Sequence, residues 1–231
     1  MDNYQYAYIL GSLLVGLPIW SILLVHRQDL WKEILFSSLT VGIIAPFWEL
    51  AFLKDYWHPE LMNPWRIVIG DFFYGFFFGA IASVIYEECY GKYFSKRKNR
   101  KHHWSFFIVP FIFVSCLVFL IPVRLGAHSI YASFIMFFVL SAAMFFFRRD
   151  LLADSLISGL LVGLITLIGY SFFIFLFPGI IQAWWKLENL SGVFVYGIPL
   201  EELVWAFGMG MVGGPVYEFF MGLKFKQRKR V

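Results

Sequence analysis

Acidic residues within long apolar stretches are the feature of this sequence that could carry chemistry. Asp71 lies inside the stretch Arg66–Tyr90, Glu49 lies near the end of Ile34–Leu53, and Glu201 and Glu202 lie well inside Val193–Gly222. A carboxylate inside a bilayer is costly, so each acid needs a partner, a proton or a task. A neutral carboxylic acid in an apolar pocket is also what proton donation to an olefin requires. We expect all four in the outer half of the membrane.

The neighbours of these acids favour an apolar ligand. Pro199 would free backbone groups inside its helix, and such breaks line cavities in membrane proteins. Aromatic side chains surround the acids, and ring faces stabilise cations, including a carbocation. The alternatives are acids that pair with Arg66 or cap broken helices, and aromatics that only pack or face lipid. The candidate catalytic residues are Glu201, Glu202, Asp71 and Glu49, and the candidate substrate-binding residues are Pro199, Trp205, Phe72, Phe76 and Tyr74.

Other polar residues predict structural roles. Glu87, Glu88 and Glu218 lie beside Lys and Arg at helix ends, where we expect interfacial ion pairs. Trp57, Trp65, Trp184 and Trp185 fit an interfacial aromatic belt. The five histidines show no metal-ligand spacing, and Gly208–Gly214 matches GxGxxG without a preceding strand, so we expect no metal and no cofactor. Cys89 and Cys116 predict packing rather than a disulfide.

The composition predicts an all-α polytopic membrane protein. Of the 231 residues, 60% are hydrophobic and 15% are charged, whereas soluble domains carry about 25% charged residues. A bilayer-spanning helix needs roughly 20 apolar residues, and seven stretches meet this need in what we expect to be one membrane domain, 1–231. The stretches are Tyr4–Val25, Ile34–Leu53, Arg66–Tyr90, Ser105–Val123, Ile130–Phe147, Ser155–Trp184 and Val193–Gly222.

The basic residues are concentrated in alternate loops and in the C-terminal tail. The positive-inside rule therefore predicts a multi-pass protein of the cell membrane with a cytoplasmic C-terminus and an outside N-terminus. The basic run Ser95–Lys101 is typical of topology determinants or anionic-lipid contacts, and we expect membrane lipids rather than nucleic acid as its partner. A homo-oligomer is left open by the sequence.

The two halves of the chain resemble each other. RQDLWKEILFSSLTVGII (Arg27–Ile44) and RRDLLADSLISGLLVGLI (Arg148–Ile165) are identical at half of their positions. The match continues further along, where Trp57 aligns with Trp185, the Tyr86-Glu87 pair with Tyr217-Glu218, and Asp71 with Glu202. We predict a parallel 3+1+3 repeat: helices 1–3 in residues 1–101, a linker helix in 102–125, and helices 5–7 in 126–231. An axis along the membrane normal would bring Asp71 and Glu202 to similar depth beside a cavity between the halves.

The segment GIPLEELVWAF (Gly197–Phe207), preceded by Trp185 and Gly192, resembles the membrane-integral, non-flavin lycopene cyclase domain family. The resemblance implies a fused seven-helix form and a redox-neutral isomerisation. In that reaction the ends of lycopene are protonated, closed into rings through a carbocation, and deprotonated. It places Pro199, Glu201 and Glu202 in the family's Pro-x-Glu-Glu motif. The first half departs from that motif, with Asp71 in IGDFFYG (Ile69–Gly75) and no proline.

Two further functions are compatible with the same residues. The acids could bind a proton or cation in a coupled carrier, or the chain could be a non-catalytic protein that binds lipid or carotenoid. The aromatic content and the lack of intramembrane basic residues favour an apolar isoprenoid or carotenoid over an anionic solute.

Overall fold

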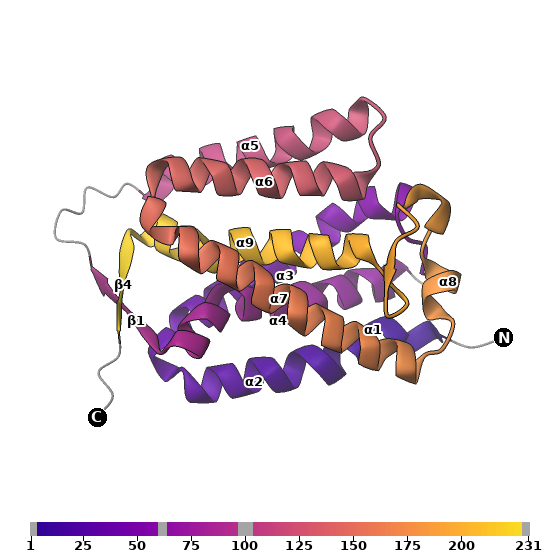
Figure 1. Ribbon diagram of the computed structural model, residues 1–231, viewed down its shortest axis with the longest axis horizontal. Coiled ribbons are helices and arrows are strands. Elements are labelled where there is room, and N and C mark those ends of the chain that lie inside the picture. Colours follow the sequence, from indigo (N-terminus) through magenta and orange to yellow (C-terminus); the bar gives the residue numbers. More distant parts are fainter. Residues whose placement is uncertain (1–3, 60–63, 97–103, 228–231) are drawn as a thin grey trace.

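A computed structural model describes residues 4–59, 64–96 and 104–227 as a bundle of long helices that lie along one common direction (Figure 1). The first half contains η1 (Tyr4–Tyr6), α1 (Ala7–Gly11), the π-helical turn η2 (Ser12–Gly16), α2 (Leu17–His26), η3 (Gln28–Leu30), α3 (Trp31–Asp55), α4 (Pro64–Tyr90) and β1 (Lys92–Lys96). After α5 (Trp104–Arg124), the second half contains α6 (Ser129–Phe147), η4 (Arg149–Leu151), α7 (Leu152–Leu176), α8 (Ile180–Trp184), η5 (Leu187–Asn189), β2 (Phe194–Val195), β3 (Ile198–Pro199), α9 (Leu200–Met221) and β4 (Leu223–Gln227).

Five segments are long and apolar enough to cross a membrane within the described residues. They are Ala7–His26, Gln28–Asp55, Val68–Tyr90, Ser129–Phe147 and Arg149–Leu176. The described apolar part of α5, Ile108–Arg124, is shorter, and α9, which carries three glutamates, is not among the five. These helices indicate an all-α membrane-associated protein.

The last two predicted stretches differ from the structure at their boundaries. Ser155–Trp184 is not one helix, because α7 ends at Leu176 and α8 begins at Ile180 after Gly179, whose φ is 84°. Val193–Gly222 becomes helical only at Leu200, after the short β2–β3 pairing.

Pro199 is therefore the N-cap residue of α9 and does not break the helix. A proline near a helix start is tolerated because the first backbone N–H groups have no partner within the helix. Glu201 and Glu202 consequently lie in the first turn rather than deep inside α9. Their charges are favourable there, since the helix dipole is positive at its N-terminal end.

Small residues hold the helix pairs α3–α4 and α7–α9 together. A Cβ atom added at Gly210 of α9 would lie 2.6 Å from the carbonyl oxygen of Ser158 in α7. In the first half, a Cβ atom at Gly75 of α4 would lie 2.8 Å from the carbonyl oxygen of Val41 in α3. The small side chains thus permit a backbone approach typical of membrane helices.

Residues that align between the two halves lie opposite each other at both ends of the bundle. Trp57 and Trp185 form an antiparallel β-bridge, flanked by a 2.9 Å hydrogen bond from Lys186 N to the carbonyl oxygen of Tyr56. At the other end, β1 pairs antiparallel with β4 about Phe94 and Phe225 (Figure 1).

Candidate functional site

A cavity of about 430 Å³ lies between the two halves of the bundle. Side chains of α3, α4, α5, α6, α7 and α9 line it, and Tyr56, Trp57, Trp184 and Trp185 line the end nearest the loops. Its volume falls in the range of roughly 300–1,000 Å³ found for small-molecule sites. The walls are mainly aromatic and aliphatic, and no described lining residue is Lys, Arg or His.

Glu202 is the most extensively hydrogen-bonded acid of the cavity. Its Oε1 accepts hydrogen bonds from the hydroxyl of Tyr56 and from Nε1 of Trp185 at 2.7 Å. Its Oε2 accepts one from the hydroxyl of Tyr170 at 2.8 Å. Burial and the adjacent Glu202 charge raise the pKa of Tyr56 well above its ordinary value, so this phenol remains a donor. The carboxyl group is thereby fixed in one orientation.

Asp71 and Glu49 face the same cavity with fewer partners. Oδ1 of Asp71 accepts a 2.5 Å hydrogen bond from the hydroxyl of Tyr8, while Oδ2 is buried without a partner. Glu49 lines the same cavity as Trp57, and its Oε1 is buried without a partner. Each of these acids therefore presents a free carboxyl oxygen in an apolar site.

Glu201 lies outside the cavity lining, although it adjoins Glu202 in sequence. Its Oε1 accepts hydrogen bonds from the hydroxyl of Tyr131 at 3.1 Å and from the backbone N–H of Ser191 at 2.7 Å. Successive residues of a helix do not share a face. The structure therefore separates the predicted pair and brings Glu202 together with Asp71 and Glu49.

The predicted aromatic residues are divided in the same way. Trp205 and Tyr74 line the cavity. Phe72 and Phe76 do not, because they lie on another face of α4, where Phe76 packs on Trp20 with ring centroids 5.4 Å apart. Pro199 is also outside the lining and acts at the start of α9.

Sequence reasoning missed the hydrogen-bond donors Tyr8, Tyr56, Tyr170 and Trp185. Trp57, Trp184 and Trp185 were predicted to form an interfacial belt, but they are buried in one hydrophobic cluster; the side chain of Trp65 lies outside the described residues. The alignment of Trp57 with Trp185 was an available signal for this role. Tyr8 and Tyr170 had none, since their sequence neighbours are mainly apolar helix residues, and Tyr56 was marked only by its place beside Trp57.

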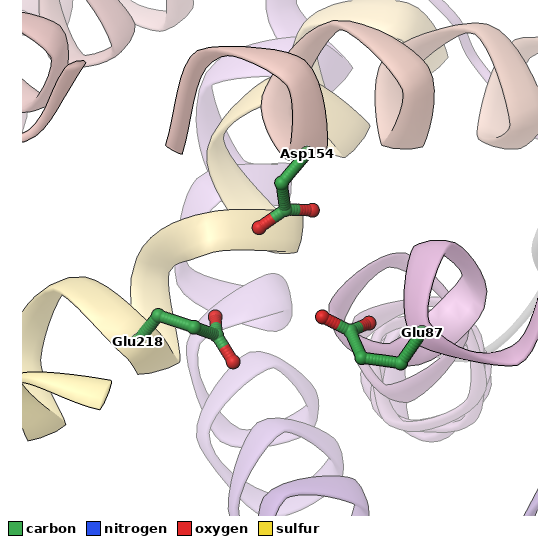
Figure 2. A group of neighbouring side chains, drawn as sticks. All are labelled: Glu87, Asp154 and Glu218. Carbon is green, nitrogen blue, oxygen red and sulfur yellow. The ribbon is translucent and has the colours of Figure 1, made fainter. Parts of the chain in front are cut away.

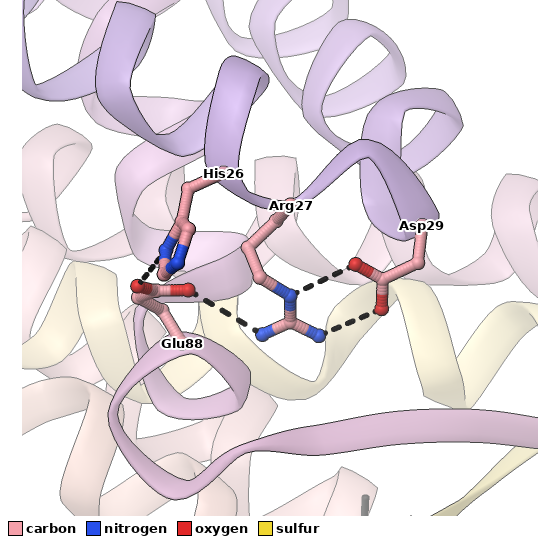
Figure 3. A network of polar contacts seen from close by, with 4 residues as sticks. All are labelled: His26, Arg27, Asp29 and Glu88. Atoms are coloured by element: carbon pink, nitrogen blue, oxygen red, sulfur yellow. Dashed lines mark hydrogen bonds and ion pairs between the residues drawn. The ribbon is translucent and has the colours of Figure 1, made fainter. Parts of the chain in front are cut away.

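Glu88 confirms the predicted ion pairing at the opposite end of the bundle. It contacts Nδ1 of His26 at 2.6 Å and NH1 of Arg27 at 3.7 Å (Figure 3). Arg27 is buried and forms two 2.9 Å hydrogen bonds to Asp29; burial opposes its charge, but this pairing raises its pKa overall. Arg148 binds Asp150 in the same manner.

The prediction of interfacial ion pairs is wrong for Glu87 and Glu218. Both are fully buried, and neither carboxyl group has a hydrogen-bond partner.

The helices and the cavity together define a class: an all-α membrane protein with acidic groups facing an apolar internal site. Residues 128–220 match the family model described as lycopene cyclase. This match confirms the resemblance predicted from Gly197–Phe207, and with the apolar helices it indicates a membrane carotenoid cyclase-like protein. The matched segment contains α6, α7 and α9 and does not extend into the first half. No curated protein and no solved structure is significantly similar to the chain.

Proposed function

We propose that this protein is a membrane-embedded cyclase that converts a linear isoprenoid polyene, such as lycopene, into a ring-bearing product without net oxidation or reduction. The observation that carries the proposal is the convergence of Asp71, Glu49 and Glu202 on one aromatic cavity that no described cationic side chain lines. Acids in such a site are suited to proton transfer with an apolar substrate.

The shape of the cavity supports a long, linear substrate. Its lining residues on α9 extend from Glu202 to Phe220, a distance of about 27 Å at 1.5 Å per residue. Ile44 and Ile112 line the cavity and are also 38% and 51% exposed. Their position between α3 and α5 provides an apolar entrance from the bilayer.

Acid–base chemistry follows from the different hydrogen bonding of the three carboxyl groups. A proton moves from Asp71 or Glu49, which line the cavity and each have a carboxyl oxygen without a partner, to the terminal double bond of the polyene. A second double bond then attacks the resulting carbocation and closes the ring. Glu202, held as an acceptor by its three donors, removes a ring proton. One proton enters and one leaves, so the reaction is an isomerisation.

The aromatic walls suit the charged intermediate of this reaction. Trp205 and Tyr74 line the cavity and lie with ring centroids 6.3 Å apart. Ring faces attract cations, so the rings of these side chains stabilise the carbocation.

We further propose that the chain has seven membrane helices arranged as a parallel 3+1+3 repeat. The pairing of Trp57 with Trp185 and of β1 with β4 supports this architecture. The helix ends support it too, because Gly91 after α4 and Gly222 after α9 have φ values of 58° and 59°. In this arrangement the cavity acids belong to the outer half of the membrane.

The decisive experiment is expression of the chain in cells that accumulate lycopene, followed by chromatography of the pigments. We expect products with one and two rings, and incubation of membranes containing the chain with unlabelled lycopene in heavy water should add one solvent deuterium per ring. Cells with the Glu202→Gln variant at equal expression provide the control. A wild-type chain that forms no cyclic product from lycopene or a related linear polyene would reject the cyclase function in favour of a carrier or binding protein.

A further inference from the structure

A second group of acids lies at the end of the bundle opposite the Trp57–Trp185 bridge. Glu87 of α4, Asp154 of α7 and Glu218 of α9 each offer a carboxylate oxygen within 4.8 Å of the others (Figure 2). All three side chains point toward one common space. Glu218 is separated from Glu202 along α9 by about 24 Å, so this group is distinct from the cavity acids.

A fourth acid, Glu33 of α3, interacts electrostatically with all three. Glu33, Glu87, Asp154 and Glu218 are each at most 1% exposed. Both oxygens of every glutamate and Oδ2 of Asp154 lack a hydrogen-bond partner, while Oδ1 of Asp154 accepts a 3.0 Å bond from Ser158. Buried polar groups are normally satisfied, and buried charges are normally paired or coordinate metals.

Arg27 acts electrostatically on Glu33 and Glu87, and Arg148 acts on Glu218, but neither arginine supplies the missing hydrogen-bond partners. Arg27 and Arg148 direct paired guanidinium nitrogens to Asp29 and Asp150. Among the described residues, no Lys, Arg or His forms an ion pair within 4.0 Å of the four buried acids. The group therefore contains more carboxyl oxygens than hydrogen-bond donors.

The four acids also form two aligned pairs. The alignment of Arg27–Ile44 with Arg148–Ile165 places Glu33 on Asp154, and the alignment of Tyr86 with Tyr217 places Glu87 on Glu218. Each half of the chain thus contributes one acid from each of two helices to the same space. A single bound ion at this place would therefore contact residues from both halves of the chain.

We propose that Glu87, Asp154 and Glu218 bind a hard divalent cation such as Mn²⁺, Mg²⁺ or Ca²⁺, with the buried Glu33 adding negative charge beside them. Oxygen-only ligands select these ions over zinc or copper. Ligand distances of about 2.0–2.6 Å allow opposite oxygens to lie up to about 5 Å apart, which accommodates the observed spacing. The ion cross-links both halves at the predicted cytoplasmic end. The histidine spacing predicted no metal, and the basic neighbours of Glu87 and Glu218 predicted ion pairs at helix ends instead.

Manganese binding to the full-length protein in detergent, after removal of divalent ions by a chelator, tests this site. Electron paramagnetic resonance should show loss of the free Mn²⁺ signal corresponding to one bound ion per chain. The melting temperature should rise by roughly 5–10 °C at about 100 times the dissociation constant. Mg²⁺ and Ca²⁺ should compete with Mn²⁺.

The double variant Glu87→Gln/Glu218→Gln should lose both the bound Mn²⁺ and the temperature shift. It should remain folded in chelator, because the substitutions remove repelling charges and preserve side-chain size. Glu88→Gln, which alters the adjacent residue that binds His26, is the matched control and should retain Mn²⁺. A folded wild type with neither Mn²⁺ binding nor a shift with any of the three ions would overturn the proposal. Equal Mn²⁺ binding by the double variant would also do so.

Discussion

Hydrogen-bond donors distinguish the two groups of buried acids. Glu202 has three side-chain donors, and Asp71 has Tyr8. Glu87 and Glu218 have none. A fixed carboxyl group beside an apolar cavity is prepared for directed proton transfer, whereas converging acids without donors are prepared for a cation. The same residue type therefore has different chemistry at the two ends of α9.

The two adjacent glutamates should differ in their importance for ring formation. Glu202→Gln preserves shape but cannot accept the ring proton, so we expect cyclisation to fall by about 10² to 10⁴. Glu201→Gln should have a much smaller effect, since Glu201 bonds Tyr131 and Ser191 outside the cavity lining. Chromatographic quantification of cyclic product per amount of folded protein measures both. Equal losses in the two variants would contradict the assigned geometry.

Helix packing depends on close backbone contact at a few glycines. In the α7–α9 pair, a side chain at Gly210 would collide with the backbone of Ser158. Gly163 lies on α7 in the same helix pair, but a Cβ atom there would lie 3.8 Å from the carbonyl oxygen of Leu203, an ordinary van der Waals distance. The same chemical change should therefore have different effects at these two positions.

Gly210→Ala should destabilise the protein by about 1–3 kcal/mol through overpacking. Gly163→Ala should be neutral or slightly stabilising, because it has room and reduces unfolded-chain entropy. Thermal unfolding in the same detergent measures the difference. A stability loss at Gly163 as large as that at Gly210 would argue against the described α7–α9 contact.

Arg148 joins the start of α7 to the end of α9. Besides binding Asp150, it donates hydrogen bonds to the carbonyl oxygens of Glu218 and Leu223 at 3.2 and 2.8 Å. Arg148→Gln should destabilise the fold by about 1–3 kcal/mol, because the carbonyl oxygens of Glu218 and Leu223 lose a charged donor while Asp150 remains exposed to solvent.

The neighbouring, exposed Arg149 provides the control, and Arg149→Gln should change stability little. Denaturant or thermal unfolding of the two variants gives the comparison. Cyclisation per folded Arg148→Gln molecule should remain near the wild-type value. A selective loss of activity at unchanged stability would contradict a purely structural role.

At the scale of the whole molecule, the two halves meet at both ends of the bundle. The Trp57–Trp185 bridge closes one end and the β1–β4 pairing closes the other (Figure 1). The carboxyl-lined cavity and the proposed cation site each take residues from both halves. Neither site can be complete in one half alone.

The proposed seven-helix topology predicts a cytoplasmic C-terminus and an N-terminus outside, because basic residues are concentrated in alternate loops and the tail. A reporter that is active only in the cytoplasm should work when fused after Val231 and fail when fused before Met1. With a reporter that is active only outside the cell, the fusion before Met1 should work and the fusion after Val231 should fail. An extracytoplasmic C-terminus would refute the proposed helix count.

The sequence by itself determined the helical membrane class, the acids that could carry chemistry and the resemblance to lycopene cyclases. These features depend on local composition and short spacing, which a chain carries before it folds. The family match to residues 128–220 includes the segment Gly197–Phe207 on which the resemblance was based. Alignment of the halves also paired residues that lie opposite each other, such as Trp57 and Trp185.

Only the tertiary structure decided which side chains share a site. An apolar helix has no polar face to show which side is turned toward the cavity. Packing against the other helices therefore decides that Glu202 lines the cavity and that Glu201 and Phe76 do not. The burial of Glu87 and Glu218 likewise depends on the meeting of both halves. Helix periodicity gives the angle between neighbouring side chains around the helix axis, but the fold determines which face of the helix contacts the partner helices.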